Sequence, residues 1–146
     1  MTFVLIKKRC SFLWVYSSFY IIIKIMEIKK TIIIVDDNEP TRALLRGVLE
    51  NAGYAVIESG DGEAAVSMAK DEKPDAAIID QYMEPYNGYK VAEMMKYQKV
   101  EIPMIMITAH DATDLFLQAQ KHGFSNVMKK PIDPERLLWI LSRELR

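Results

Sequence analysis

From residue 31 onward the chain alternates between short apolar runs and longer amphipathic stretches, and this alternation restricts its fold more than any other feature. The run Thr31–Asp36 is rich in β-branched residues, as is typical of a strand buried on both faces. The expected strands are residues 31–36, 54–58, 76–80, 103–108 and 125–129, and the expected helices are residues 40–52, 61–72, 88–97, 111–122 and 134–146. This pattern predicts one α/β domain whose parallel sheet is covered by helices on both faces.

Charge is distributed unevenly along the chain. The formal net charge is −1, yet residues 1–25 carry four basic residues and no acidic one, so the remaining 15 Lys and Arg against 20 Asp and Glu give −5. The net negative charge of residues 26–146 argues against direct binding of nucleic acid through a basic surface. The single cysteine, Cys10, excludes an internal disulfide and a cysteine-based zinc cluster.

Residues 1–25 differ in character from the rest of the chain. Lys7-Lys8-Arg9 precede the apolar run Cys10–Ile23, as in a signal peptide, but no small-residue cleavage site follows. The run is also shorter than the roughly 20 residues that span a bilayer. Three interpretations stay open: a short membrane anchor, an apolar helix packed on another surface, or sequence upstream of the functional protein. We expect an N-terminal extension over residues 1–25 and a cytoplasmic domain over residues 26–146, with membrane attachment only if the extension is a real anchor.

Polar residues stand where the expected strands end. Asp36 and Asp37 follow the first strand, Asp80 the third, Thr108 the fourth and Lys130 the fifth. In parallel α/β sheets, ligands bind outside the carboxyl ends of the strands, so we expect these five residues to share one crevice. Three converging carboxylates repel one another unless a cation lies among them, and oxygen ligands suit a hard ion such as Mg²⁺.

The same crevice is suited to a phosphoryl group. A carboxylate can act as a nucleophile and form an aspartyl phosphate. Mg²⁺ and the ammonium group of Lys130 would neutralise charge on the transferring oxygens, and the hydroxyl of Thr108 faces the same edge.

Four short motifs at successive strand ends resemble the signature of the response-regulator receiver domain of two-component signalling. They are Val35-Asp36-Asp37, Ile78-Ile79-Asp80, Ile107-Thr108-Ala109 and Lys130-Pro131. Each motif alone is weak, but their order and spacing match along residues 28–146. The resemblance implies a flavodoxin-like, doubly wound sheet of five parallel strands in the order 2-1-3-4-5, with five helices.

The resemblance also implies a role for each site residue. Asp80 would accept a phosphoryl group from a histidine kinase or phosphotransfer protein. Asp36 and Asp37 would hold Mg²⁺ together with Asp80 and the backbone carbonyl of Tyr82. Thr108 would turn its hydroxyl to the phosphoryl group and Lys130 would pair with it.

Three further features follow from the resemblance. Pro131 would follow Lys130 through a cis peptide bond. Tyr82 and His110 would line the path of the water that attacks the phosphoryl group. Because no output segment follows the last helix, we expect a stand-alone receiver that signals to an unknown downstream protein by contact. We expect it to catalyse no reaction beyond its own phosphorylation and dephosphorylation.

The sequence departs from the family pattern at two places. Met83 and Gly88 are in register after Asp80, but Glu84 occupies the usual proline position and the proline moves to Pro85. Val127 stands three residues before the lysine, where receivers usually carry an aromatic side chain that moves together with the threonine. Chemistry at Asp80 can survive this change, whereas the change leaves open whether the usual relay from the threonine operates.

Two other functions stay open. One is a receiver-like interaction module that no longer switches, which Glu84 and Val127 favour. The other is an aspartyl-phosphate phosphatase, but that class carries a second Asp two residues after the nucleophile, where this sequence has Tyr82. We interpret His110 and His122 as surface residues, and we leave open whether Trp139 on the last helix belongs to the core or to an interface.

Overall fold

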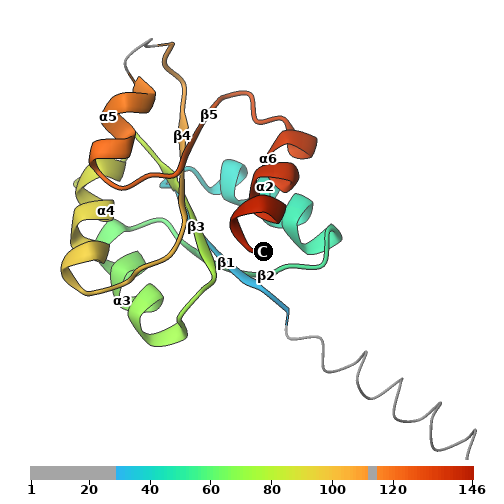
Figure 1. The fold of residues 1–146 in the computed structure, drawn as a ribbon, viewed down its shortest axis with the longest axis horizontal. Coiled ribbons are helices and arrows are strands. Elements are labelled where there is room, and N and C mark those ends of the chain that lie inside the picture. Colours follow the sequence, from blue (N-terminus) through green and yellow to red (C-terminus); the bar gives the residue numbers. More distant parts are fainter. Residues whose placement is uncertain (1–28, 112–114) are drawn as a thin grey trace, which may run out of the picture.

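The computed structural model describes residues 29–111 and 115–146, and these residues form a five-stranded parallel sheet with helices on both sides (Figure 1). The strands lie in the order β2-β1-β3-β4-β5, and every neighbouring pair is parallel. The strands are β1 (Thr31–Val35), β2 (Ala55–Ser59), β3 (Ala76–Asp80), β4 (Met104–Thr108) and β5 (Asn126–Lys129). The helices are α2 (Glu39–Asn51), α3 (Gly62–Glu72), α4 (Gly88–Tyr97), α5 (Leu115–Lys121) and α6 (Pro134–Glu144).

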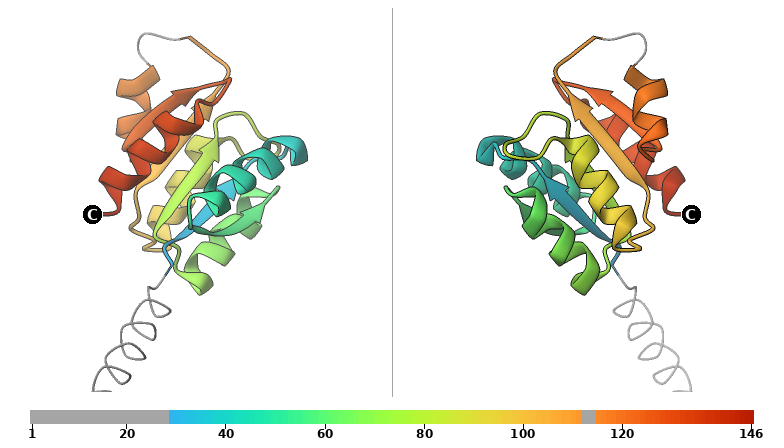
Figure 2. Two further views of the ribbon diagram at one scale, coloured as in Figure 1. Left: turned by 90° about the vertical axis from the view of Figure 1, so that its right-hand side faces the viewer. Right: turned by 90° about the vertical axis from the view of Figure 1, so that its left-hand side faces the viewer.

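Two apolar layers enclose the sheet. Helices α2 and α6 cover one face, and α3, α4 and α5 cover the other (Figures 1 and 2). Successive residues of a strand point to opposite faces, so Ile32 and Ile34 pack under α2 and α6 while Ile33 and Val35 pack under the other three helices. The central strands β3 and β4 are buried along their whole length. Burial on both faces explains why these strands are continuously apolar rather than alternating.

Short polar side chains precede the first turns of three helices. Asn38, Asp61 and Asn87 each accept a hydrogen bond from the backbone N–H three residues later, at 2.7–3.0 Å. These bonds satisfy donors that the first turn of a helix leaves unpaired. Gly53 and Gly123 follow α2 and α5 with φ of 93° and 96°, a conformation that glycine adopts without a steric cost.

The predicted fold class and strand order are confirmed, and the expected bounds agree with the observed ones to within two residues, apart from the helix expected to begin at residue 111. The helix expected from residue 111 has Asp111 outside it, residues 112–114 lie outside the described residues, and α5 begins at Leu115. The expectations for residues 1–25 also lie outside the described residues. Within residues 29–111 and 115–146, none of the helices has the length and apolar character needed to cross a bilayer.

Candidate functional site

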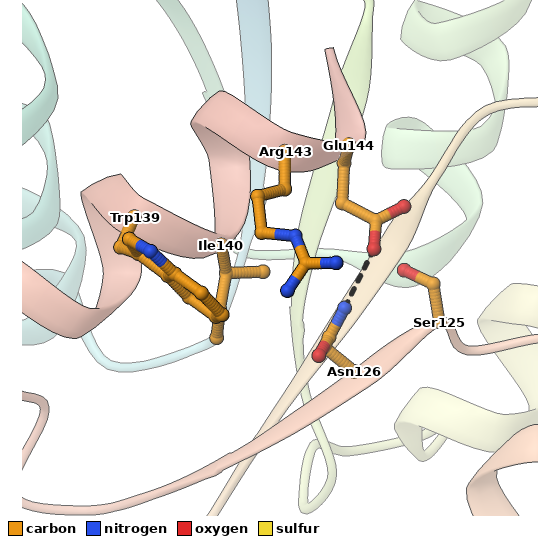
Figure 3. A pocket seen from close by; sticks show the side chains of 6 residues that line it. All are labelled: Ser125, Asn126, Trp139, Ile140, Arg143 and Glu144. Atoms are coloured by element: carbon orange, nitrogen blue, oxygen red, sulfur yellow. Dashed lines mark hydrogen bonds between the residues drawn. The ribbon is translucent and has the colours of Figure 1, made fainter. Parts of the chain in front are cut away.

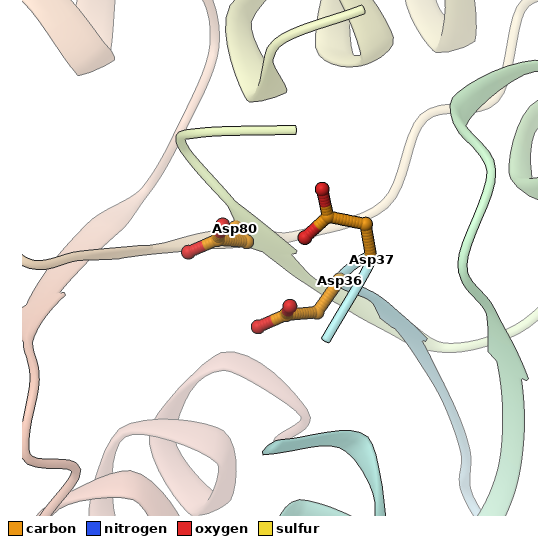
Figure 4. A group of neighbouring side chains, drawn as sticks. All are labelled: Asp36, Asp37 and Asp80. Carbon is orange, nitrogen blue, oxygen red and sulfur yellow. The ribbon is translucent and has the colours of Figure 1, made fainter. Parts of the chain in front are cut away.

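Three carboxylates meet at the carboxyl edge of the sheet. Asp36 and Asp37 follow β1, Asp80 ends β3, and these strands are hydrogen-bonded neighbours with Val35 opposite Ile79. One carboxylate oxygen from each residue lies within 4.8 Å of the others, and the three side chains lie side by side at the strand ends (Figure 4). Asp36 and Asp80 are buried, whereas Asp37 is exposed. The structure therefore brings together the three acids that the sequence predicts to share a crevice.

Lys130 supplies a positive charge to this cluster. Its Nζ lies 2.9 Å from Asp80 Oδ1 and 3.3 Å from Asp36 Oδ2. Its backbone N–H donates to the carbonyl of Thr108 at 2.7 Å, which ties the β5 end to the β4 end. The Lys130–Pro131 peptide bond is cis, as predicted. Burial opposes the charge of Lys130, but the hydrogen bond to Asp80 and the neighbouring carboxylates outweigh burial and raise its pKa.

The environment of Asp80 acts against its negative charge. Burial raises the pKa of Asp80, and the nearby charges of Asp36 and Asp37 raise it further. The hydrogen bond and charge of Lys130 oppose these effects without cancelling them, so the pKa stays above the ordinary value of 3.8. A cation bound among the three acids would relieve the same repulsion.

The backbone around the acids is held in place by neighbouring groups. Asp36 Oδ1 accepts from the N–H of Asn38 at 2.8 Å, and the guanidinium of Arg42 donates to the Asp36 carbonyl at 2.8 Å. Gly88, at the start of α4, packs so closely that a Cβ there would lie 2.4 Å from the carbonyl oxygen of Asp80. Only glycine allows α4 to begin against the end of β3 in this way.

Thr108 reaches the same edge, but its hydroxyl is already occupied. Its Oγ1 donates to Oε1 of Gln81 at 2.5 Å and accepts from the N–H of His110 at 3.1 Å. Gln81 is buried, and sequence reasoning missed it. The only sequence signal for Gln81 is its position directly after β3, a strand with no exposed residue. A polar side chain at such a position needs a hydrogen-bond partner.

Tyr82 and His110 lie beside each other near the carboxylates. Their ring centroids are 4.9 Å apart with the planes tilted by 49°, and Tyr82 is 52% exposed. His122, the second histidine, lies at the other end of α5 and pairs with Glu93 at 3.1 Å. The backbone carbonyl of Tyr82 as a metal ligand stays a prediction.

The donor set fits a magnesium ion. All three cluster residues offer carboxylate oxygens, the donors that Mg²⁺ prefers, and two of them are buried where an uncompensated charge is costly. Asp37 is exposed, so an ion here keeps contact with solvent and can retain water ligands. The arrangement thus combines a buried carboxylate, an adjacent ammonium group and carboxylate oxygens that could hold a divalent cation.

A cavity lies at the opposite end of β5 from Lys130 and carries no comparable chemistry. It measures about 390 Å³ and is lined by residues of β5 and α6 (Figure 3). The guanidinium of Arg143 stacks on Trp139 at 4.8 Å, and Asn126 donates to Glu144 at 2.7 Å. Trp139, left open by the sequence, is 58% exposed.

Comparisons with known proteins agree on one family. The family described as "Response regulator receiver domain" matches residues 32–142. The chain is 35% identical over 108 residues to the alkaline phosphatase synthesis transcriptional regulatory protein PhoP of Bacillus subtilis, covering 74% of this chain and 45% of that protein. It is 30% identical over 109 residues to protein PilH of Pseudomonas aeruginosa, covering 73% of this chain and 90% of that protein.

A solved structure shows the same architecture. The chemotaxis protein CheY4 of Vibrio cholerae superimposes with a TM-score of 0.74 and 28% sequence identity, covering 80% of this chain and 99% of that chain. The chain spans about half the length of the two transcriptional regulatory proteins, PhoP of B. subtilis and PhoB of P. aeruginosa, that it matches.

Proposed function

The chain belongs to the response-regulator receiver family, and from this membership we propose that it is a phosphorylatable receiver of a two-component phosphorelay. Asp80 accepts a phosphoryl group from a histidine kinase or phosphotransfer protein. The phosphorylated protein then signals by contact with a downstream protein in the cytoplasm. Direct binding of nucleic acid is not part of the proposal, because residues 26–146 carry a net charge of −5.

One observation carries the proposal: the buried carboxylate of Asp80 lies within 4.8 Å of two other carboxylates and 2.9 Å from the ammonium group of Lys130. In the proposed reaction an Asp80 oxygen attacks the phosphorus atom of a phosphohistidine. The new O–P bond forms as the P–N bond breaks, and the donor imidazole keeps the electron pair. Lys130 holds a phosphoryl oxygen and stabilises the charge that develops on it.

Magnesium is the proposed cofactor of this site. Asp36, Asp37, Asp80 and the backbone carbonyl of Tyr82 would hold it. When bound, Mg²⁺ neutralises charge on the transferring oxygens. The protein's own part is to hold the three carboxylates together and to place the carboxylate of Asp80 beside Lys130.

A second candidate function is a receiver-shaped interaction module that no longer switches. Val127 favours it, because this half-buried valine on β5 stands where receivers usually carry the aromatic side chain that moves together with the threonine. The two functions differ in their response to beryllofluoride, an analogue of the phosphoryl group. A switching receiver binds it with Mg²⁺ and changes its affinity for a partner, whereas a non-switching module does not.

The proposal is tested by chemical phosphorylation. Incubated with Mg²⁺ and acetyl phosphate, the protein should gain one acid-stable, base-labile phosphoryl group, measured by intact mass. Asp80→Asn should abolish the gain, because the amide is a poor nucleophile. Asp75→Asn is the matched control, since Asp75 is an acid that pairs with Lys30 instead of belonging to the cluster. Undiminished labelling of the Asp80→Asn protein would refute the assignment.

A further inference from the structure

The guanidinium group of Arg42 holds the peptide unit that joins Asp36 to Asp37. Arg42 lies near the start of α2, and its Nη1 donates to the carbonyl oxygen of Asp36 at 2.8 Å. This carbonyl belongs to the planar peptide between the two acids, so the hydrogen bond fixes the orientation of that plane. On its other side, the N–H of Asp36 donates to the carbonyl of Ser59, the last residue of β2, at 3.2 Å.

The two acids differ in what else holds their side chains. Asp36 Oδ1 accepts from the N–H of Asn38 at 2.8 Å, and Asp36 Oδ2 lies 3.3 Å from Lys130 Nζ. Asp37 is exposed, and its carboxylate makes no hydrogen bond or ion pair with any residue that the structure describes. The direction of the Asp37 side chain therefore depends on its backbone, which includes the peptide plane that Arg42 holds.

The guanidinium group of Arg42 is itself restricted by the end of β2. The Arg42 side chain is 16% exposed, and its Nε lies 3.9 Å from Glu58 Oε1. Within residues 29–111 and 115–146, this Nε has no hydrogen-bond partner, so the guanidinium group is directed to the Asp36 carbonyl rather than to Glu58. Gly60 leaves room for this arrangement, because a Cβ there would lie 3.0 Å from Arg42 Nη1.

We propose that Arg42 is a positioning residue of the magnesium site: by holding the peptide between Asp36 and Asp37, it directs the carboxylate of Asp37 toward the ion. This inference rests on the proposed function. Groups that orient metal ligands without touching the metal typically contribute about ten- to a hundred-fold to metal affinity.

The charge of Arg42 would have the opposite effect on Mg²⁺ affinity. If Arg42 acted on the ion only as a nearby positive charge, removing it would strengthen Mg²⁺ binding, because like charges repel. If Arg42 positions Asp37, removing it weakens binding. Arg46 provides the matched control, because it lies one turn later on α2, carries the same charge and lies 3.2 Å from Glu58.

The test is a titration of the full chain with Mg²⁺, followed by amide chemical shifts. Arg42→Met should weaken Mg²⁺ binding about ten-fold, whereas Arg46→Met should leave it unchanged or slightly stronger. Gly60→Ala keeps every charge but crowds Arg42 Nη1, so it should also weaken binding. Asp37→Ala removes the ligand that Arg42 directs, and adding Arg42→Met to it should have no further effect.

A merely structural role for Arg42 is distinguished by measuring affinity and stability separately. Loss of a structural contact alone would lower the free energy of unfolding in a chelator and leave the Mg²⁺ affinity of the folded protein unchanged. The inference is overturned if Arg42→Met binds Mg²⁺ like wild type or more tightly, or if it weakens binding equally in the Asp37→Ala background. If Arg42→Met does not fold, wild-type affinity in Gly60→Ala overturns the inference. Absence of Mg²⁺ binding in wild type contradicts the proposed magnesium site itself.

Discussion

Replacing Asp80 by asparagine is expected to stabilise the metal-free protein at neutral pH. The carboxylate of Asp80 is repelled by two others whose oxygens lie within 4.8 Å. At that separation a pair of charges repels by about 3.5 kcal/mol at an effective dielectric constant of about 20, and by less for the exposed Asp37. The attraction of Lys130 Nζ at 2.9 Å amounts to about 6 kcal/mol on the same scale.

The Coulomb contributions therefore nearly cancel, and burial decides the sign. The side chain of Asp80 is only 7% exposed, so desolvation leaves its negative charge net unfavourable. Asparagine has nearly the same shape without the charge. We expect Asp80→Asn to raise the free energy of unfolding by about 1 kcal/mol or more, measured by urea denaturation in the presence of a chelator.

The pH dependence follows from the raised pKa of Asp80. The folded protein takes up the proton of this carboxyl at a higher pH than the unfolded chain, whose pKa is near 3.8. Asp80 thus lowers the free energy of unfolding progressively as pH rises from the unfolded pKa to the raised folded pKa. Above the folded pKa this effect is constant. The advantage of Asp80→Asn should be full at neutral pH and shrink toward acid pH. A variant less stable than wild type at neutral pH would refute this reasoning.

Asp75 provides a control, because its substitution should change the free energy of unfolding in the opposite direction. Burial alone would raise the pKa of Asp75, but the hydrogen bond from the N–H of Thr31 and the charge of Lys30 lower it overall. Its contribution to stability is present above the ordinary pKa and is lost as pH falls through the lowered folded value. Asp75→Asn should therefore destabilise the protein at neutral pH.

Three further predictions concern the metal, the phosphoryl group and the fold. Asp37→Ala should weaken Mg²⁺ binding, and a titration giving wild-type affinity would count against the proposed ligand set. Phosphorylated Tyr82→Ala, purified away from any donor, should lose its phosphoryl group faster than wild type, because the ring of Tyr82 restricts the approach of water. Decay at the wild-type rate would contradict shielding by Tyr82, and His110→Ala tests the ring that lies beside it. Gly88→Ala should lower the free energy of unfolding by about 2 kcal/mol or more, since the new Cβ would lie 2.4 Å from the Asp80 carbonyl oxygen, and an unchanged denaturation midpoint would show that α4 can shift.

The site residues that the sequence predicts are those whose positions follow from topology alone. Parallel strands end at one edge, so residues directly after β1, β3 and β5 meet whatever the details of packing. Asp36, Asp80 and Lys130 are examples: they stand at the ends of β1, β3 and β5, and Lys130 Nζ lies 2.9 Å from Asp80 and 3.3 Å from Asp36.

The sequence did not predict the features that depend on how loops return to the sheet. Gln81 is one polar residue among several after β3, and its burial depends on the path that brings Gly88 against Asp80. The apolar pattern of α4 identifies Val91 as inward-facing, but not how deep the hydroxyl of Tyr89 lies. The depth of this hydroxyl depends on how the Tyr89 ring packs on His122 and Phe124, which hydrophobic periodicity does not predict.

The strand order also has a consequence for how the protein assembles. From β2 onward, each strand pairs with one that precedes it in the chain: β2 and β3 with β1, β4 with β3, and β5 with β4. The sheet can thus grow by addition at its edges, with no strand inserted between two others. The acids at the ends of β1 and β3 are then in place before the strand that delivers Lys130. We expect pulse-labelled hydrogen exchange during refolding to protect the amides of β1 and β3 before those of β5.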